Sequence, residues 1–167
     1  MEESRISLVV AAIALLTALY ALLAKSGKTE REITGDQFIT KPLQLQAYER
    51  LVLLCERISL PSLISRTNHP GLTAREMQVF LIESIKQEFE YNISQQVYVS
   101  THAWDAVRNL RDQTMLVINK IANVTPAEAK AGELNKQLLE LMMQQEGKAL
   151  HTMTLEILNT EAKQLMK

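Results

Sequence analysis

The sequence predicts an all-α protein: one N-terminal transmembrane helix, then a cytoplasmic helical bundle with a long C-terminal helix. Two observations predict this class. Residues 6–24 form an apolar run without a charged residue, and apolar residues recur at helical spacing through most of residues 41–167. The expected organisation is a short N-terminal tail (1–5), a transmembrane helix (6–24), a juxtamembrane linker (25–40) and a helical domain (41–167).

The apolar run is interpreted as a membrane anchor. As a helix it would span roughly 28 Å, close to the hydrocarbon thickness of a bilayer. A helix buried in a soluble core would normally carry a polar stripe, and this run has none. A cleaved export signal would begin with positive charge, but Glu2 and Glu3 precede the run, and its end lacks the small-residue cleavage pattern. An uncleaved anchor therefore fits best.

Basic residues predict the orientation of this anchor. Only Arg5 precedes the run, whereas Lys25, Lys28 and Arg31 follow it closely. Because the basic flank of a span stays in the cytoplasm, we expect the N-terminus outside and residues 25–167 inside the cell. The same basic residues are expected to lie against anionic lipid headgroups.

Five small residues of the anchor share one helical face. Their spacing alternates between four and three, and they are Ser7, Ala11, Ala14, Ala18 and Ala21. Small residues let transmembrane helices approach closely, so this face is a candidate packing surface for another membrane protein or for a second copy of the chain. The alternative is that alanine is simply frequent here, since Ala12 and Ala24 lie off the stripe.

The first helix of the domain is expected to begin at Pro42, because proline suits the first helical position. Leu60-Pro61 is expected to end it, with a short helical turn at residues 62–66. The single cysteine, Cys55, has no partner for an intrachain disulfide and is expected to act as a small buried hydrophobe. The expected core face is Leu43, Ala47, Leu51, Leu54, Cys55 and Ile58.

Thr73 and Glu76 have the spacing of a capping box, which predicts the start of the next helix. Its expected core face is Met77, Phe80, Leu81, Ile85 and Phe89. The following stretch, "EYNISQQVYVSTHAW", is compatible with a short extended piece or with a helical connector. Ser100 or Thr101 is expected to cap the helix after it, whose predicted face is Trp104, Val107, Arg111, Met115, Ile118 and Ile121.

The last helix is expected to start at Thr125-Pro126-Ala127-Glu128, which combines a capping box with proline at the first helical position. The favoured interpretation is one long helix to the C-terminus with a weak point at Gly147, because an interior glycine costs only about 1 kcal/mol. A pair of helices bent at Gly147 is the alternative. The expected apolar face is Ala131, Leu138, Met142, Ala149, Met153 and Ile157.

No motif in the sequence predicts catalysis, a cofactor or a metal. The 18 basic and 19 acidic residues nearly balance, so no basic footprint for nucleic acid is expected. The three histidines, His69, His102 and His151, lack metal-ligand spacing, and the isolated glycines form no phosphate-binding loop.

Aromatic residues concentrate around residues 89–104. Tyr91, Tyr98 and Trp104 are candidates for an interaction surface, because Tyr and Trp are favoured in interfaces. The alternative, which the sequence favours, is that these bulky residues fill a helix crossing at the centre of the domain.

The order of a short N-terminal span, "LQAYERLVLLCERISLPSLISR" and "EFEYNISQQVYVSTHAWDAVRNLRDQT" resembles a family of small bacterial single-pass membrane proteins of unknown function. The resemblance covers most of the chain. It implies location in the bacterial inner membrane, and it supplies no activity, ligand or site residue.

The expected function is that of a membrane-anchored adaptor or accessory subunit that acts through protein contacts, with membrane lipid and another membrane protein as partners. A self-assembling structural protein is the second hypothesis. The third is an enzyme whose site has no recognisable motif, which a structure would reveal as a concave pocket with convergent polar groups.

Overall fold

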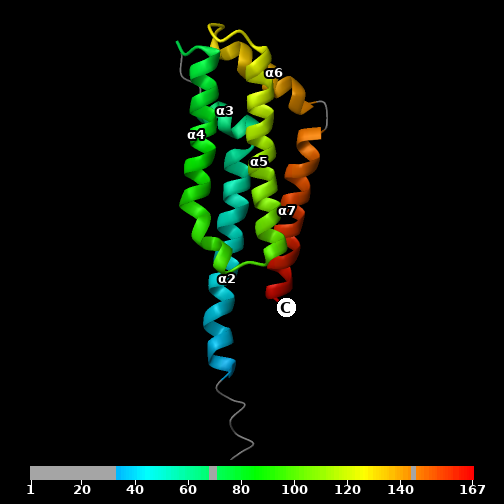
Figure 1. Ribbon diagram of the computed structural model, residues 1–167. Coiled ribbons are helices and arrows are strands. Elements are labelled where there is room, and N and C mark those ends of the chain that lie inside the picture. The colour runs from blue at the N-terminus through cyan, green and yellow to red at the C-terminus, as the bar shows by residue number, and fades with distance from the viewer. Residues whose placement is uncertain (1–32, 68–70, 144–145) are drawn as a thin grey trace, which may run out of the picture. The chain divides into compact units, whose positions relative to one another are not determined.

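The computed structural model describes residues 33–67, 71–143 and 146–167, and within these ranges it contains helices and no named strand (Figure 1). The expected all-α class is confirmed. An isolated β-bridge joins Thr73 to Lys130. The elements are α2 (Ile33–Ile58), α3 (Leu60–Thr67), α4 (Ala74–Asn92), the 3₁₀ helix η2 (Ile93–Val97), α5 (Thr101–Val124), α6 (Ala131–Met143) and α7 (Glu146–Leu165).

The chain divides into two units, residues 1–41 and 42–167, and α2 crosses the boundary between them. The expectation that the helix starts at Pro42 is wrong: Pro42 lies inside α2, which begins at Ile33 within the stretch expected to be a linker. Proline inside a helix removes one backbone hydrogen bond and its ring clashes with the carbonyl four residues before it, at a cost of about 3 kcal/mol, but it does not prevent helical turns on either side. Proline therefore marks the unit boundary without ending the helix.

Residues 42–167 form a helical bundle. The Pro42–Ile58 part of α2 lies alongside α4, α5 and α7 in Figure 1, with α6 at the opposite end from η2. Helix α5 packs against both α4 and α7, while α3 and α6 contact each other and α4. A salt bridge of 2.7 Å between Arg57 Nε and Glu88 Oε2 joins α2 to α4. The bundle thus joins segments that are distant in the sequence.

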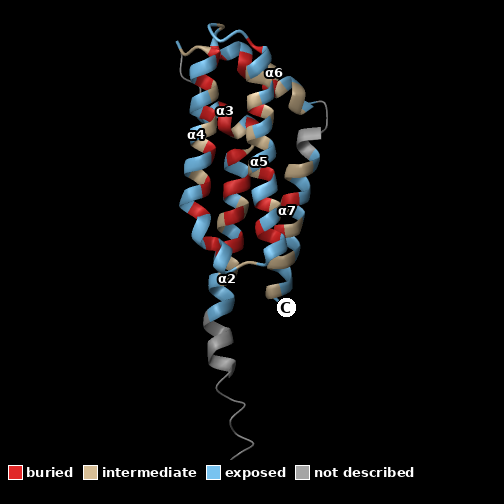
Figure 2. Cartoon of the chain, viewed as in Figure 1, coloured by how far each residue is buried: buried red, intermediate tan, exposed pale blue. Residues whose placement is uncertain are grey.

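The apolar faces of these helices meet in one core, and Figure 2 shows the buried positions on the inward faces. The core positions expected in α2 from Ala47 onward are confirmed, including Cys55. In α4, the expected positions Met77, Leu81, Ile85 and Phe89 are also buried. One expected core residue in each of these two helices is wrong, since Leu43 and Phe80 are 42% and 40% exposed. Neighbouring apolar residues compete for one helical face, and Leu81 occupies the inward position beside Phe80.

Local capping signals are confirmed at two helix starts. Thr73 Oγ1 accepts from the backbone N–H of Glu76 at 3.2 Å, and Glu76 Oε2 accepts from the N–H of Thr73 at 2.9 Å. Ser100 is the N-cap of α5, and its hydroxyl accepts from the N–H of Ala103 at 2.9 Å. The ambiguous stretch before it contains η2, which makes it a helical connector.

The expected helix start at Thr125 is wrong. Thr125 is the C-cap of α5, and α6 begins only at Ala131. The intervening loop instead supports the start of α4: the carbonyls of Ala129 and Ala127 accept from the N–H groups of Ala74 and Arg75, at 2.7 and 3.2 Å. The first N–H groups of a helix have no partner within it, so this loop satisfies donors of a helix far away in sequence.

The expected single long C-terminal helix is also wrong. It is replaced by α6 and α7, which pack against each other, and Gly147 lies in the first turn of α7. The buried positions of α6 and α7 therefore follow two separate helical patterns. The single apolar face expected to continue from α6 does not match the buried positions of α7. Met153 is 57% exposed, whereas Thr154 and Leu158 are buried.

Candidate functional site

The three aromatic residues singled out as an interaction surface lie in different environments. Trp104 is buried in the core, with its ring centroid 5.2 Å from that of Phe89. Tyr91 is 74% exposed, with the guanidinium of Arg50 5.2 Å from its ring centroid, and Tyr98 is 38% exposed. Trp104 therefore stabilises a helix crossing, and only the two tyrosines are available for contacts.

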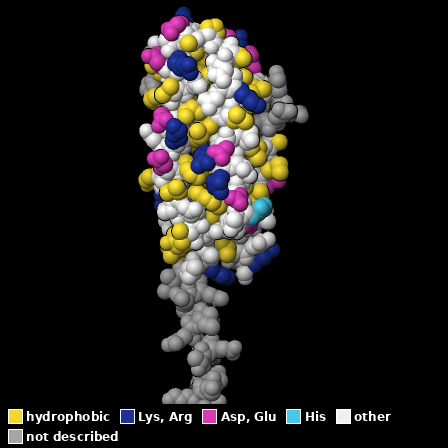
Figure 3. All heavy atoms as spheres, in the orientation of Figure 1, with side chains coloured by type: hydrophobic (Ala, Val, Ile, Leu, Met, Phe, Trp, Pro, Cys, Tyr) yellow, Lys and Arg dark blue, Asp and Glu magenta, His cyan; other side chains and the backbone are white. Residues whose placement is uncertain are grey.

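Four large apolar residues between positions 91 and 98, around the α4–α5 connection, have exposed side chains. We call them the η2 surface: Tyr91, Ile93, Val97 and Tyr98. Ile93 and Val97 are 46% and 75% exposed, while Gln95 is the buried residue of η2. Large apolar side chains that gather on a surface often mark a contact site. Figure 3 shows hydrophobic side chains at the surface, between charged residues of both signs.

A hydrogen-bonded cluster around Glu161 joins three helices. Tyr48 Oη from α2 and Ser100 Oγ from the start of α5 each donate to Glu161 Oε2 at 2.6 Å. His102 Nδ1 lies 3.1 Å from Glu161 Oε1. Burial alone would raise the pKa of Glu161, but the hydrogen bonds from Ser100, Tyr48 and His102 outweigh burial and lower it. Burial, reinforced by Glu161, raises the pKa of Tyr48.

This cluster has the residue types of a hydrolytic triad but a different geometry. Catalytic serine donates its proton to a histidine base. Here Ser100 Oγ donates to the carboxylate of Glu161, which His102 also contacts. The arrangement holds α2, α5 and α7 together through one shared acceptor, so its geometry is that of a structural clamp. Sequence reasoning missed it because Tyr48 and Glu161 are 113 residues apart.

The structure also shows the surroundings of the one cysteine and of the residue types that bind metals. Cys55 is buried, and burial followed by the nearby Glu56 charge raises its pKa to about 12, which makes the thiol unreactive. Among the described residues, no group of three or more His, Cys, Asp or Glu side chains is arranged to hold a metal ion.

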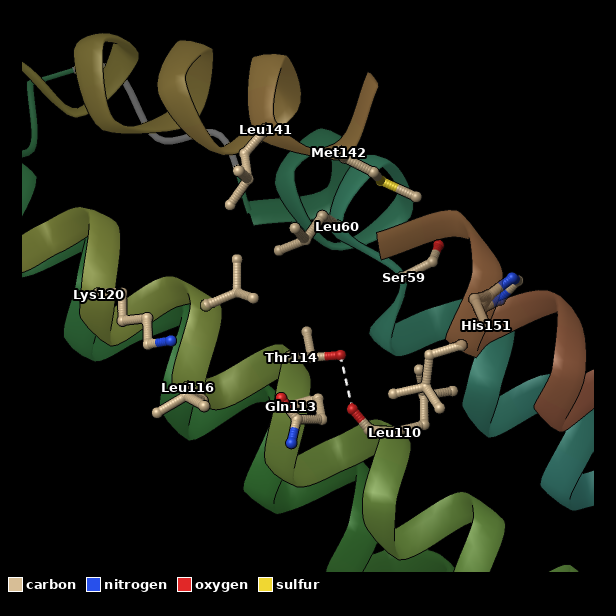
Figure 4. Close-up of a pocket in the computed structure, with 12 residues that line it drawn as sticks. Ser59, Leu60, Leu110, Gln113, Thr114, Leu116, Lys120, Leu141, Met142 and His151 are labelled. Carbon is tan, nitrogen blue, oxygen red and sulfur yellow. Dashed lines mark hydrogen bonds between the residues drawn. The ribbon is translucent and has the colours of Figure 1, made fainter. Parts of the chain in front are cut away.

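A cavity of about 280 Å³ lies between α5, α6, α7 and the α2–α3 junction (Figure 4). Its apolar lining includes Leu60, Leu110, Val117, Leu141, Met142 and Leu150. The polar residues around it include Lys120 on α5 and His151 on α7. His151 Nε2 is buried without a hydrogen-bond partner and lies 3.9 Å from Glu56 Oε2. No sequence motif indicated this cavity, because its walls come from separate helices.

Several predicted features lie outside the described residues: the span 6–24, its small-residue face (Ser7, Ala11, Ala14, Ala18 and Ala21) and the basic residues Lys25, Lys28 and Arg31. Within the described ranges, no helix combines the length and the apolar character that a membrane crossing requires.

Comparison with known proteins gives one match. The model of the family of unknown function DUF7935 matches residues 4–165. No curated protein and no solved structure matches the chain.

Proposed function

Because the chain belongs to the DUF7935 family of unknown function, we propose its role from its own residues: it is a membrane-anchored helical adaptor, an accessory subunit that holds a partner protein at the membrane. The partner docks on the η2 surface. The observation that carries this proposal is the exposure of Tyr91, Val97 and their apolar neighbours on a connection between two packed helices.

The chemistry of the η2 surface supports a protein partner. Tyrosine offers a large apolar ring with a polar hydroxyl, and it is enriched where proteins meet. Exposed Val97 contributes nothing to the core, so burial against a partner is the interaction that its side chain can still gain. The surface sits on helices fixed by the core, which keeps the ordering cost of docking small.

Residues 6–24 supply the anchor in this proposal, as a single span of the bacterial inner membrane. The N-terminus lies outside, and Lys25, Lys28 and Arg31 keep the helical domain in the cytoplasm. A reporter fused after Lys167 tests this orientation. A reporter that functions only outside the cytoplasm should stay silent, and its activity there would overturn the orientation.

The docking proposal is tested with two matched valines. Val97 and Val124 are 75% and 74% exposed and lie near opposite ends of α5, whose length is about 36 Å. Tagged full-length chains carrying Val97→Glu or Val124→Glu are crosslinked in intact membranes and purified, and the proteins recovered with each are quantified. A docking role predicts that Val97→Glu lowers recovery of the main partner at least fivefold, while Val124→Glu does not. Equal recovery with both variants would refute it.

Self-assembly through the small-residue face of the anchor is the alternative function. Isoleucine at both Ala14 and Ala18 would hold a neighbouring helix away, while Ala12→Ile adds bulk elsewhere on the helix. Two differently tagged copies should then crosslink less in the double variant than in the control. The same crosslinking with both would argue against this alternative.

A further inference from the structure

We propose that the cavity between α5, α6, α7 and the α2–α3 junction binds a medium-chain alkyl carboxylate, with its carboxylate at Lys120 and its chain among the apolar walls. This binding activity is separate from partner docking, because none of the cavity's lining residues belongs to the η2 surface.

The walls determine that most of the ligand is apolar. Two hydroxyls at the cavity already donate to backbone carbonyls: Thr114 Oγ1 donates to the carbonyl of Leu110 at 2.8 Å, and Ser59 Oγ donates to that of Glu56 at 2.8 Å. Figure 4 shows the first of these bonds, with Leu60 and Leu141 on the facing side. The amide of Gln113 on α5 also lines the cavity, but most of the lining consists of leucine, valine and methionine side chains, and an alkyl chain gains free energy from burial against them.

The volume limits the length of the chain. A cavity of about 280 Å³ lies at the lower end of the range of small-molecule sites, about 300 to 1,000 Å³, so it matches a single medium-length alkyl chain. Both chains of a diacyl phospholipid would exceed it.

Charge determines the head group and its position. Among the residues whose side chains are described, the lining includes Lys120 and no aspartate or glutamate, and no carboxylate lies within ion-pair distance of Lys120. Lys120 is solvent-exposed, so an anion paired with it keeps part of its hydration. At the other side of the cavity Glu56 lies 3.9 Å from His151 and would repel an anion. The carboxylate therefore sits at Lys120, and the end of the alkyl chain points toward α7.

Photocrosslinking tests the proposal with the full chain in native membranes. The probe is decanoate carrying a diazirine near its terminal carbon, and labelled peptides are identified by mass spectrometry. A phosphatidylcholine with the same diazirine on one long chain is the second probe, since a membrane lipid is the other source of alkyl chains. Saturable labelling of peptides from α6 or α7 by the decanoate probe, at least fivefold above the lipid probe, is expected. Labelling confined to residues 6–24, or stronger labelling of the cavity by the lipid probe, overturns the proposal.

Variants separate the cavity from general membrane partitioning. Val117→Phe fills the cavity and should lower decanoate labelling at least tenfold. Because a core change can disturb folding, the exposed substitution Lys120→Gln is the second variant, and loss of one solvent-exposed ion pair should lower labelling about two- to fivefold. Lys163→Gln, also exposed but away from the cavity, is the charge-matched control and should label like the unmodified chain. Equal labelling in Lys120→Gln and Lys163→Gln would refute the assigned position of the carboxylate.

Discussion

Replacing Glu161 by alanine should destabilise the bundle, because this carboxylate is the shared acceptor of a cluster that joins three helices. The substitution removes the acceptor for Tyr48 Oη and Ser100 Oγ, both at 2.6 Å, and the contact with His102. Hydrogen bonds to charged groups contribute about 1.5 to 3 kcal/mol when their partners are buried.

The exposure of each partner determines the size of the effect. Tyr48 is only 4% exposed, so its hydroxyl would lose a partner that water replaces poorly. Ser100 and His102 are exposed and would be rehydrated, which leaves about 0.5 to 1 kcal/mol for their contacts. We therefore expect Glu161→Ala to lower the free energy of unfolding by about 2 to 3 kcal/mol. Tyr48→Phe should lower it by about 1 to 2 kcal/mol.

The measurement is urea-induced unfolding of residues 42–167, followed by far-ultraviolet circular dichroism. This unit has its own hydrophobic core and is expected to unfold cooperatively. Glu156→Ala is the matched control: Glu156 is exposed on the same helix, and its loss should change stability by less than about 0.5 kcal/mol. In the double variant of Tyr48 and Glu161, the two losses should fall short of additivity by about 1 kcal/mol. Additive losses, or equal effects of Glu161→Ala and Glu156→Ala, would refute the clamp.

The same cluster predicts how stability depends on pH. The pKa of Glu161 is lowered in the folded chain, so folding favours the charged carboxylate. Its contribution is complete above the ordinary glutamate pKa of about 4.3 and is lost as the pH falls through the lower folded value. The stability difference between the unmodified unit and Glu161→Ala should therefore shrink below about pH 4. A difference that grows on acidification would contradict this assignment.

Three further outcomes test the core and one turn. Leu81→Ala should lower the free energy of unfolding in urea by about 2 to 5 kcal/mol, because Leu81 is fully buried. Leu53→Ala, at a 56% exposed position, should lower it by less than about 1 kcal/mol. Similar losses in both variants would mean that the assigned faces are wrong. Cys55 should react with a thiol reagent only after urea unfolding, since its side chain is buried and its pKa is about 12, and rapid labelling of the folded chain would disprove its burial. Gly71 has a φ of 99°, so Gly71→Ala should lower stability by about 1 kcal/mol or more, and an unchanged urea midpoint would argue against this backbone conformation.

Features encoded within one or two helical turns could be predicted from the sequence. The capping box at Thr73, the cap at Ser100 and the inward face of α2 from Ala47 onward depend on residues a few positions apart. The interactions that form these features connect residues close in the sequence, so residue spacing is enough to identify them.

Features that depend on distant segments could not be predicted. Thr125 and Glu128 have capping-box spacing, yet this loop bonds to the start of α4, and only the folded chain brings those groups together. The Glu161 cluster and the cavity likewise draw residues from separate helices. The apolar stripe drawn through α6 and α7 failed because a break between helices resets which positions face inward.

The backbone pairing between the start of α4 and the loop before α6 has a consequence for hydrogen exchange. Amides in the first turn of a helix usually exchange quickly with solvent deuterium, because helix ends fray. Here the amides of Ala74 and Arg75 donate to Ala129 and Ala127, and the amide of Ala131 donates to Leu72. These bonds link the loop after α5 to the start of α4, and η2 connects the other ends of the two helices. Fraying of the first turn of α4 alone therefore does not break these hydrogen bonds. The amides of Ala74, Arg75 and Ala131 should exchange slowly, at one common rate, through a cooperative opening that separates α6 from α4.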